Sequence, residues 1–250
     1  MITAYHRPKT LDEALTLLTQ PNTLPLGGGT LLSHPTSDSV QAVDLQALGL
    51  DSLTKNGNNL ELGATLTLQA LLVSEYCPAA LKSALKLEAP LNIRNAATVA
   101  GTLVACDGRS TFASMLLAMD AKITVTSKQK AEETINIGDL LPLREQVRGK
   151  LITRIIIPLN VKLAFESVAR TPADKPIVCA ALAQWNSGRT RLVLGGYGKS
   201  PMLAMDGTEA EGVDAAARNT YHEATDEWAS AEYRVDVAST LAKRCLENLK

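Results

Sequence analysis

Residues 92–105 read NIRNAATVAGTLVA, and this polar stretch of small residues separates two segments that look helical. It shows neither the 3.6-residue apolar period of a helix nor the alternation of a strand, so the sequence predicts a turn here rather than part of the core. On its N-terminal side, Pro78 is well suited to open a helix over 78–89. On its C-terminal side, the apolar run at 111–121 predicts a buried helix that leads into a strand at 122–127.

A second small-residue stretch, GGGT at 27–30, follows a short predicted strand at 23–26. Glycine lets a backbone approach a phosphate closely and adopt left-handed dihedral angles, so that successive N–H groups converge on the anion. The dinucleotide-binding spacing fails because Leu32 stands where the third glycine is needed, and a P-loop ending in the later Gly-Lys-Ser would need glycine at Val193. Two candidate phosphate turns remain, 27–30 and Thr98–Thr102, and each alone is also compatible with an ordinary turn.

The rest of the N-terminal half shows regular patterns. Thr10 and Glu13 have the spacing of a capping box, and the apolar repeat that follows predicts a helix over 11–18. Further apolar patterns predict two strands at 40–45 and 59–64 joined by a Gly-Asn-Asn turn, a helix at 68–75 capped by Thr67, and a central strand at 151–158. The proline that closes this last strand places a domain boundary near Asn160.

Beyond that boundary the pattern changes to strands followed by helices. The sequence predicts strands at 162–170, 177–185 and 190–198, and helices within 207–221 and 230–250. This order favours a segregated α+β arrangement over parallel βαβ winding. We expect Arg234 and Tyr233 to anchor the last helix, and Trp228 to pack rather than stack on a ligand.

Composition excludes several classes of protein. The chain has 250 residues, of which 46% are hydrophobic and 20% are charged, as in an ordinary soluble protein. A formal net charge of −1 and an aromatic content of 4% argue against nucleic acid or an anionic membrane as the main partner. The four cysteines are scattered and lie far from the three histidines, so no metal site is predicted. Together with the lack of a signal peptide or a membrane-length apolar run, this pattern predicts a cytoplasmic protein.

Several motifs occur in the order and spacing of one protein family: LGGGTLL at 26–32, IRNAATVAGTL at 93–103 followed by MLLAMDAKITV at 115–125, ITRIIIP at 152–158, FESVARTPAD at 165–174 and SAEYRVDVASTLAKR at 230–244. With them the chain resembles the FAD-binding medium subunit of molybdenum hydroxylases, the group of carbon monoxide and xanthine dehydrogenases. The resemblance implies an α+β fold. A PCMH-type FAD-binding domain at 1–160 would consist of two small α/β subdomains, about 1–55 and 56–160, and a C-terminal α+β domain would follow at 161–250.

The resemblance also implies which residues line the cofactor. The first FAD-contacting turn, whose backbone amides lie along the pyrophosphate, would comprise Leu26, Gly27, Gly28, Gly29, Thr30 and Leu31. The second turn would comprise Thr98, Ala100, Gly101 and Thr102. Thr111 falls where the family commonly has an aspartate that contacts the sugar hydroxyls of the cofactor. In this interpretation 92–105 is a cofactor-lining turn, held by hydrogen bonds from Arg94 and Asn95 and leading into a helix from Leu103.

The chain departs from the family pattern at the second turn. Ala100 replaces the first glycine, and its methyl group fits only if φ is negative or the cofactor does not crowd it. Thr102 replaces an asparagine, and Thr111 is not a carboxylate, although Asp107 is a candidate substitute. His34, close to the first turn, is interpreted as a solvated loop residue. These departures leave open a second hypothesis, a family member that has lost FAD and acts as a structural or binding module.

No side chain is predicted to be a catalytic acid, base or nucleophile. The resemblance implies a flavoprotein oxidoreductase subunit that depends on two partners, a molybdopterin-binding large subunit and an iron–sulfur small subunit. Electrons would pass from the iron–sulfur partner through FAD to NAD or another acceptor, since a cofactor does the chemistry while the protein positions it. A third hypothesis, a stand-alone flavin oxidase or reductase, would require a substrate pocket and a base of its own.

Overall fold

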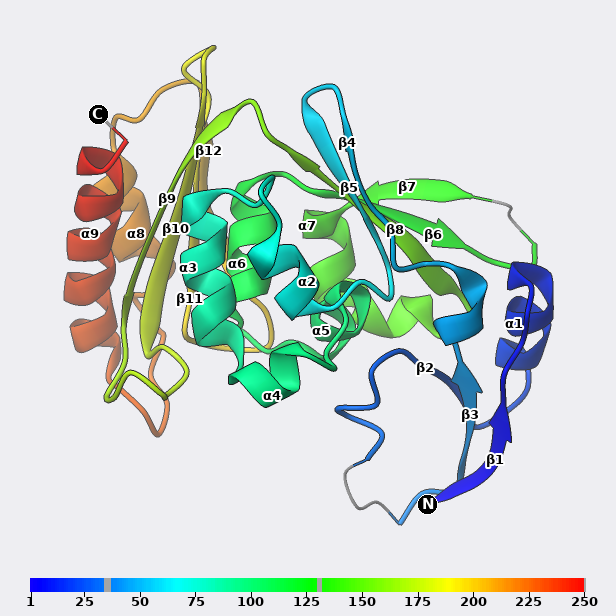
Figure 1. The fold of residues 1–250 in the computed structure, drawn as a ribbon. Helices are drawn as coiled ribbons and strands as arrows, with labels where there is room; N and C mark the ends of the chain where they lie inside the picture. Colours follow the sequence, from blue (N-terminus) through cyan, green and yellow to red (C-terminus); the bar gives the residue numbers. More distant parts are fainter. Residues whose placement is uncertain (34–36, 130–131, 250) are drawn as a thin grey trace. The chain divides into compact units, whose positions relative to one another are not determined.

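The chain alternates between two structural units instead of completing one before the other. A computed structural model describes residues 1–33, 37–129 and 132–249 (Figure 1). The first unit comprises Met1–Val73, Leu91–Ala105 and Lys122–Ile156, and the second comprises Ser74–Pro90, Cys106–Ala121 and Ile157–Lys250. The last crossing, after Ile156, lies close to the expected boundary near Asn160. Two earlier segments nevertheless join the C-terminal region, so the units are not the same division as the predicted domains.

A small parallel sheet with one helix opens the first unit. Its strand order is β1-β3-β2, with β1 at Ile2–His6, β2 at Thr23–Leu26 and β3 at Val40–Asp44. Helix α1 (Leu11–Leu18) begins as predicted, because Thr10 Oγ1 accepts the N–H of Glu13 at 3.2 Å. Its apolar side packs with strand β3 and its neighbours in one buried cluster: Ala14, Leu15, Leu18, Val43, Leu45 and Leu151.

A five-stranded sheet forms the rest of this unit. Its order is β4-β5-β8-β6-β7, with bounds Leu53–Asn56, Asn59–Gly63, Leu151–Pro158, Lys122–Thr126 and Glu133–Asn136. Strand β8 is central, as its β-branched sequence predicts. The Gly-Asn-Asn turn was predicted to join the strands at 40–45 and 59–64. It joins β4 to β5 instead, and the 40–45 strand, β3, belongs to the other sheet.

The turn predicted over 92–105 is wrong in form, since this stretch holds two short helices. They are α4 (Leu91–Arg94) and α5 (Val99–Ala105), and the unit also contains α2 (Leu68–Val73), α7 (Ile137–Leu140) and the 3₁₀ helices η1 (Gln46–Leu48) and η2 (Leu141–Val147). Helix α5 buries Val99, Ala100 and Leu103. These three residues share one side of a helix of only two turns, which is too short to show an apolar period in the sequence.

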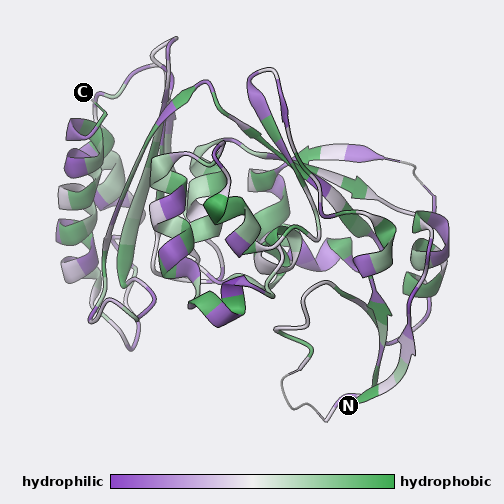
Figure 2. Cartoon of the chain, viewed as in Figure 1, coloured by the Kyte–Doolittle hydropathy of each residue, from purple (hydrophilic) through white to green (hydrophobic). Residues whose placement is uncertain are grey.

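The second unit has helices on both faces of an antiparallel sheet. Its strand order is β12-β11-β10-β9, with bounds Met202–Gly207, Thr190–Gly195, Val178–Trp185 and Val161–Val168. Helices α8 (Val213–Thr220) and α9 (Ala231–Glu247) cover one face, and α3 (Ala79–Glu88) and α6 (Thr111–Ala118) cover the other (Figure 1). Every residue of α6 is buried, as predicted, and this helix is mostly pale to green in Figure 2, whereas α9 carries both purple and green residues.

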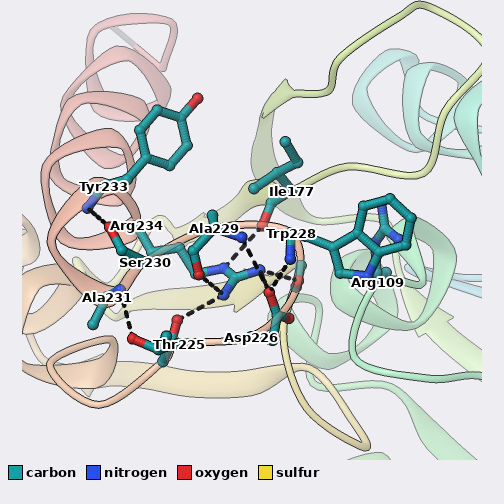
Figure 3. Close-up of polar contacts among 12 residues, drawn as sticks. Arg109, Ile177, Thr225, Asp226, Trp228, Ala229, Ser230, Ala231, Tyr233 and Arg234 are labelled. Atoms are coloured by element: carbon teal, nitrogen blue, oxygen red, sulfur yellow. Dashed lines mark hydrogen bonds and ion pairs between the residues drawn. The ribbon is translucent and has the colours of Figure 1, made fainter.

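Arg234 anchors the last helix, as predicted. Its guanidinium is fully buried and donates to the carbonyl oxygens of Ala224 at 2.6 Å and Ala229 at 3.1 Å, and to Asp226 Oδ1 at 2.8 Å (Figure 3). Longer hydrogen bonds of 3.4 Å reach the carbonyl oxygens of Ile177 and Gly196. One side chain at the start of α9 thus fixes the loop before the helix and two turns at the end of the sheet.

Tyr233 and Trp228 differ in how far they meet the expectations. The side chain of Tyr233 is exposed, so of the two predicted anchors only Arg234 holds α9 through its side chain. Trp228 contacts two arginine side chains, with the guanidinium carbons of Arg109 and Arg170 at 4.4 and 4.6 Å from its ring centroid, but 36% of it is exposed. That it does not stack on a ligand stays a prediction.

Candidate functional site

The first glycine turn lies at the carboxyl end of a parallel strand. Residues 27–31 directly follow β2, whose last residue, Leu26, is paired with Asp44 at the end of β3. The hydrogen bond from Leu45 N to Leu26 O, 3.0 Å long, holds these two ends together. In open sheets of parallel strands, ligands bind outside the carboxyl ends of the strands. The position of the turn in the fold is therefore that of a ligand site.

The backbone of this turn leaves its N–H groups without protein acceptors in the part of the chain that the structure describes. Gly29 has φ of +72°, a left-handed conformation that favours glycine, and its carbonyl accepts Ser33 N at 3.0 Å and Ser33 Oγ at 2.7 Å. In the described part of the chain, the N–H groups of residues 27–31 donate no hydrogen bond to the protein. Partly exposed amides of this kind are free to bind an oxyanion such as a phosphate.

The second turn is built differently, because its amides are used inside the protein. Val99 N donates to Leu66 O at 2.9 Å and Ala100 N donates to Ala64 O at 3.2 Å. Gly101 N donates to Thr98 Oγ1 at 3.1 Å, which makes Thr98 the cap of helix α5. The N–H of Thr102 and its hydroxyl both donate to the carbonyl of Thr98, at 2.9 and 2.8 Å. The amides of this turn are therefore bonded within the protein, unlike those of the first turn.

Ala100 meets the condition that its methyl group requires. It lies inside α5, and it is not among the residues with positive φ. A helical φ is negative, so an alanine fits there without backbone strain. The loss of the customary glycine at this position is compatible with the local backbone.

The two turns are in direct contact, and this contact explains the glycines of the first turn. A Cβ atom on Gly28 would lie 1.6 Å from the carbonyl oxygen of Ala96, a distance that no side chain can occupy. A Cβ atom on Gly27 would lie 2.8 Å from Oγ1 and 3.1 Å from Cγ2 of Thr98. Residues 27–28 and 96–98 therefore form one continuous wall, although they lie far apart in the sequence.

Thr111 belongs to the second unit, where its side chain has internal partners. It is the first residue of α6, it is fully buried, and its Oγ1 lies 2.7 Å from Ala84 O and 3.1 Å from Glu88 Oε2. The Glu88 carboxylate also accepts the N–H of Phe112 at 2.8 Å, so it occupies the amino end of α6. A contact between Thr111 and the sugar of a cofactor stays a prediction.

Other residues singled out in the sequence have structural partners. Arg94 Nε donates to Gln69 Oε1 at 3.0 Å, which ties α4 to α2 as expected. Asp107 accepts the N–H of Arg109 at 2.9 Å and pairs with Lys175 at 3.2 Å. His34 lies outside the described residues.

Asp44 is a residue that the sequence did not single out. Its carboxylate is almost fully buried at the end of β3, accepts the N–H of Gln46 at 2.9 Å and the hydroxyl of Tyr5, and lies 3.7 Å from Arg7 Nε. The hydrogen bond to this carboxylate raises the pKa of Tyr5. The sequence could have indicated this residue, because Asp44 is a charged residue at the end of an otherwise apolar predicted strand. The Asp44 side chain fixes the end of β3 beside the first turn.

Metal-ligating groups, thiols and long apolar helices are the remaining features that could indicate a function. Among the residues described, no group of three or more His, Cys, Asp or Glu side chains is arranged to hold a metal ion. All four cysteines are free and buried, and burial raises the pKa of Cys77 and Cys179 to about 12. Across 1–33, 37–129 and 132–249, none of the helices combines the length and the apolar character that crossing a bilayer requires.

Comparison with known proteins extends these observations. Residues 1–160 match the sequence model of a family described as the FAD binding domain in molybdopterin dehydrogenase. The uncharacterized protein YgfM of Escherichia coli (strain K12) is 28% identical over 250 residues, covering 96% of this chain and 94% of that protein. The carbon monoxide dehydrogenase medium chain of Afipia carboxidovorans is 24% identical over 283 residues, covering 98% of this chain and 96% of that protein.

A solved structure shows the same fold. The reconstituted CO dehydrogenase from Oligotropha carboxidovorans contains a chain that superposes with a TM-score of 0.82 at 24% identity, covering 98% of this chain and 96% of that one. At this identity the likeness is one of fold alone. It confirms the α+β fold class that the sequence predicted.

Proposed function

Because this chain belongs to the family of FAD binding domains in molybdopterin dehydrogenases, we propose that its first turn, residues 27–31, holds the pyrophosphate of FAD. The family match confirms three predictions from the sequence: the family itself, FAD as its cofactor and an oxidoreductase subunit as its class. The chain is accordingly an FAD-binding medium subunit of the molybdenum hydroxylase type.

One observation carries the assignment of the pyrophosphate to the first turn. Its amides have no acceptor in the described chain, whereas the amides that open α5 are all paired with protein oxygens. A pyrophosphate carries negative charge and needs N–H donors at short range, and hydrogen bonds to charged groups contribute about 1.5–3 kcal/mol each. The first turn supplies such donors, and residues 98, 100, 101 and 102 form the wall beside it. Thr111 is retained as a candidate contact to the sugar.

Bound FAD supplies a redox centre, and the chain determines its position and its access to solvent. In the proposed scheme an iron–sulfur small subunit delivers electrons to it, and NAD or another acceptor receives them. A molybdopterin-binding large subunit oxidises the substrate. The name of the medium-chain relative from Afipia carboxidovorans, a carbon monoxide dehydrogenase, supports a multi-subunit complex. The four free, buried cysteines suit a reducing compartment, and we propose the cytoplasm.

The first experiment is a visible absorption spectrum of the purified chain before and after incubation with FAD and removal of unbound cofactor. We expect close to one flavin per chain. Gly28→Ala, which drives a methyl group into Ala96 O, should lower the FAD affinity by at least about 100-fold. Gly57→Asn is the matched control, because Gly57 lies in the β4–β5 hairpin of the same unit. A Cβ atom added there would meet nothing within 4 Å, and Asn tolerates the left-handed backbone.

A colourless wild-type chain that stays colourless with FAD would reject the cofactor site and favour a structural or binding module. Two further measurements address the electron path. Anaerobic NADH should bleach the flavin if NAD is the acceptor, and bleaching by dithionite alone would indicate another acceptor. Purification from the native source should bring down a molybdopterin chain and an iron–sulfur chain. Recovery of this chain alone would contradict the proposed complex.

A further inference from the structure

The side chain of Thr98 makes two contacts that join the turns of the proposed FAD site. Its hydroxyl oxygen accepts the N–H of Gly101 and so caps helix α5, at 3.1 Å. The same oxygen and the methyl carbon lie close to Gly27, because a Cβ atom added there would be 2.8 and 3.1 Å from them. Only 6% of Thr98 is exposed. The residue therefore faces the first turn instead of solvent.

The backbone around Thr98 is fixed from several directions. Its carbonyl accepts the Thr102 hydroxyl at 2.8 Å, and its backbone forms an isolated β-bridge with Thr67. The neighbouring amides of Val99 and Ala100 are bonded to carbonyl oxygens next to β5. A side chain on such a base has little freedom, and its cap hydrogen bond restricts χ1 further.

We propose that Thr98 is a positioning residue, which holds the backbone of Gly27 in the conformation that presents the amides of the first turn to the pyrophosphate. This inference rests on the proposed function of that turn. It gives the second turn a role other than binding phosphate through its own amides. The role requires both parts of the side chain: the hydroxyl sets the orientation of Thr98, and the oxygen and methyl carbon together support Gly27.

The first test compares two helix caps in the same unit. Thr98→Val keeps the shape of the side chain but removes the cap of α5. Thr10→Val removes the equivalent cap of α1, where Glu13 N donates to Thr10 Oγ1 at 3.2 Å, without touching a glycine of the first turn. Titration with FAD should show about a 10-fold weaker affinity for Thr98→Val and an unchanged affinity for Thr10→Val. Thermal unfolding without FAD should show similar losses of stability for both.

The second test examines the contact between Gly27 and the Thr98 side chain, by asking whether a change at Thr98 restores the FAD binding that a change at Gly27 removes. Gly27→Ala should lose FAD affinity, because its methyl group collides with Oγ1 and Cγ2 of Thr98. Adding Thr98→Ala removes both atoms and leaves only a Cβ contact of 3.6 Å, so the double variant should bind FAD as well as Thr98→Ala alone. Gly28→Ala is the control, because it meets the backbone of Ala96 and no change at Thr98 can relieve it.

Wild-type affinity in Thr98→Val, equal loss in Thr10→Val, or failure of Thr98→Ala to improve binding by Gly27→Ala would each overturn the positioning role. These outcomes presuppose that the wild-type chain binds FAD. A wild-type chain without affinity for FAD would instead reject the proposed function. The two failures are thus distinguished by the wild-type titration.

Discussion

Replacing Arg234 by methionine tests the reasoning about the second unit most directly. The substitution keeps an apolar stem but removes a fully buried guanidinium that donates to Asp226 and to four carbonyl oxygens. Three of these hydrogen bonds are 3.1 Å or shorter. At about 1.5 kcal/mol each for a charged donor, their loss should cost about 4–5 kcal/mol. This value agrees with the cost of breaking a buried ion pair by removing one partner, which is about 3–5 kcal/mol.

The chain offers a convenient probe for this measurement. Its two tryptophans, Trp185 and Trp228, both belong to the second unit, so tryptophan fluorescence in urea reports the unfolding of that unit. With a urea dependence of about 2 kcal/mol/M, a loss of about 4 kcal/mol lowers the midpoint by about 2 M. Since whole domains are stable by only about 5–15 kcal/mol, the variant should be close to unfolding without denaturant.

Arg218→Met is the matched control. Arg218 also pairs with an aspartate, Asp236, at 3.0 Å, but its side chain is 48% exposed and that of its partner 77% exposed. Exposed pairs contribute about 0–1 kcal/mol, so this control should unfold almost as the wild type does. If Arg234→Met came within about 1 kcal/mol of Arg218→Met, the anchoring of α9 by Arg234 would be refuted.

Three other perturbations have defined outcomes. The hydrogen bond from Arg189 lowers the pKa of Asp206. This carboxylate therefore stabilises the fold above its unfolded-state pKa, and the stabilisation is lost as the pH falls through its folded-state pKa. Asp206→Asn should flatten the acid limb of the stability–pH curve, and an unaltered limb would contradict this. Burial raises the pKa of Cys179 to about 12, so a thiol reagent at pH 8 should label it only after unfolding, and rapid labelling of the native chain would be inconsistent with the structure. Thr10→Ala removes the cap on Glu13 N and should cost about 1 kcal/mol, measured as faster hydrogen exchange in α1, with unchanged exchange as the opposing result.

The elements that the sequence predicted correctly carry their signal within a few residues. Helix α1 has both its capping box and its apolar repeat, and strand β8 is a run of β-branched residues. The strands that were missed, β1, β4, β7 and β12, all lie at an edge of their sheet. An edge strand is covered on fewer sides, so exposed residues such as those of β4 give neither an apolar run nor a clean alternation.

In the candidate site, too, the sequence revealed the local features but not those that depend on contacts between distant segments. The glycines of the first turn were recognisable because a strand followed by glycines is a local pattern. The reason that Gly28 must be a glycine is not local, because it is the carbonyl of Ala96 in a distant segment. Nor could the sequence show that the α5 amides have protein acceptors, since those acceptors, Ala64 O and Leu66 O, follow β5. Pairing between distant segments decides which amides are free.

This pairing also bears on the substitutions that suggested a family member without FAD. A glycine at position 100 is needed only if its backbone is left-handed or must approach a ligand, and in this chain Ala100 is a helical residue whose N–H is bonded to Ala64 O. The hydroxyl of Thr102 donates to the carbonyl of Thr98, and this hydrogen bond helps to fix the residue that we propose positions Gly27. Both departures therefore lie in the segment that we propose supports the first turn, while the glycines that allow its close contact with Ala96 and Thr98 are retained. The substitutions thus favour a cofactor site with a reinforced wall over a site that has decayed.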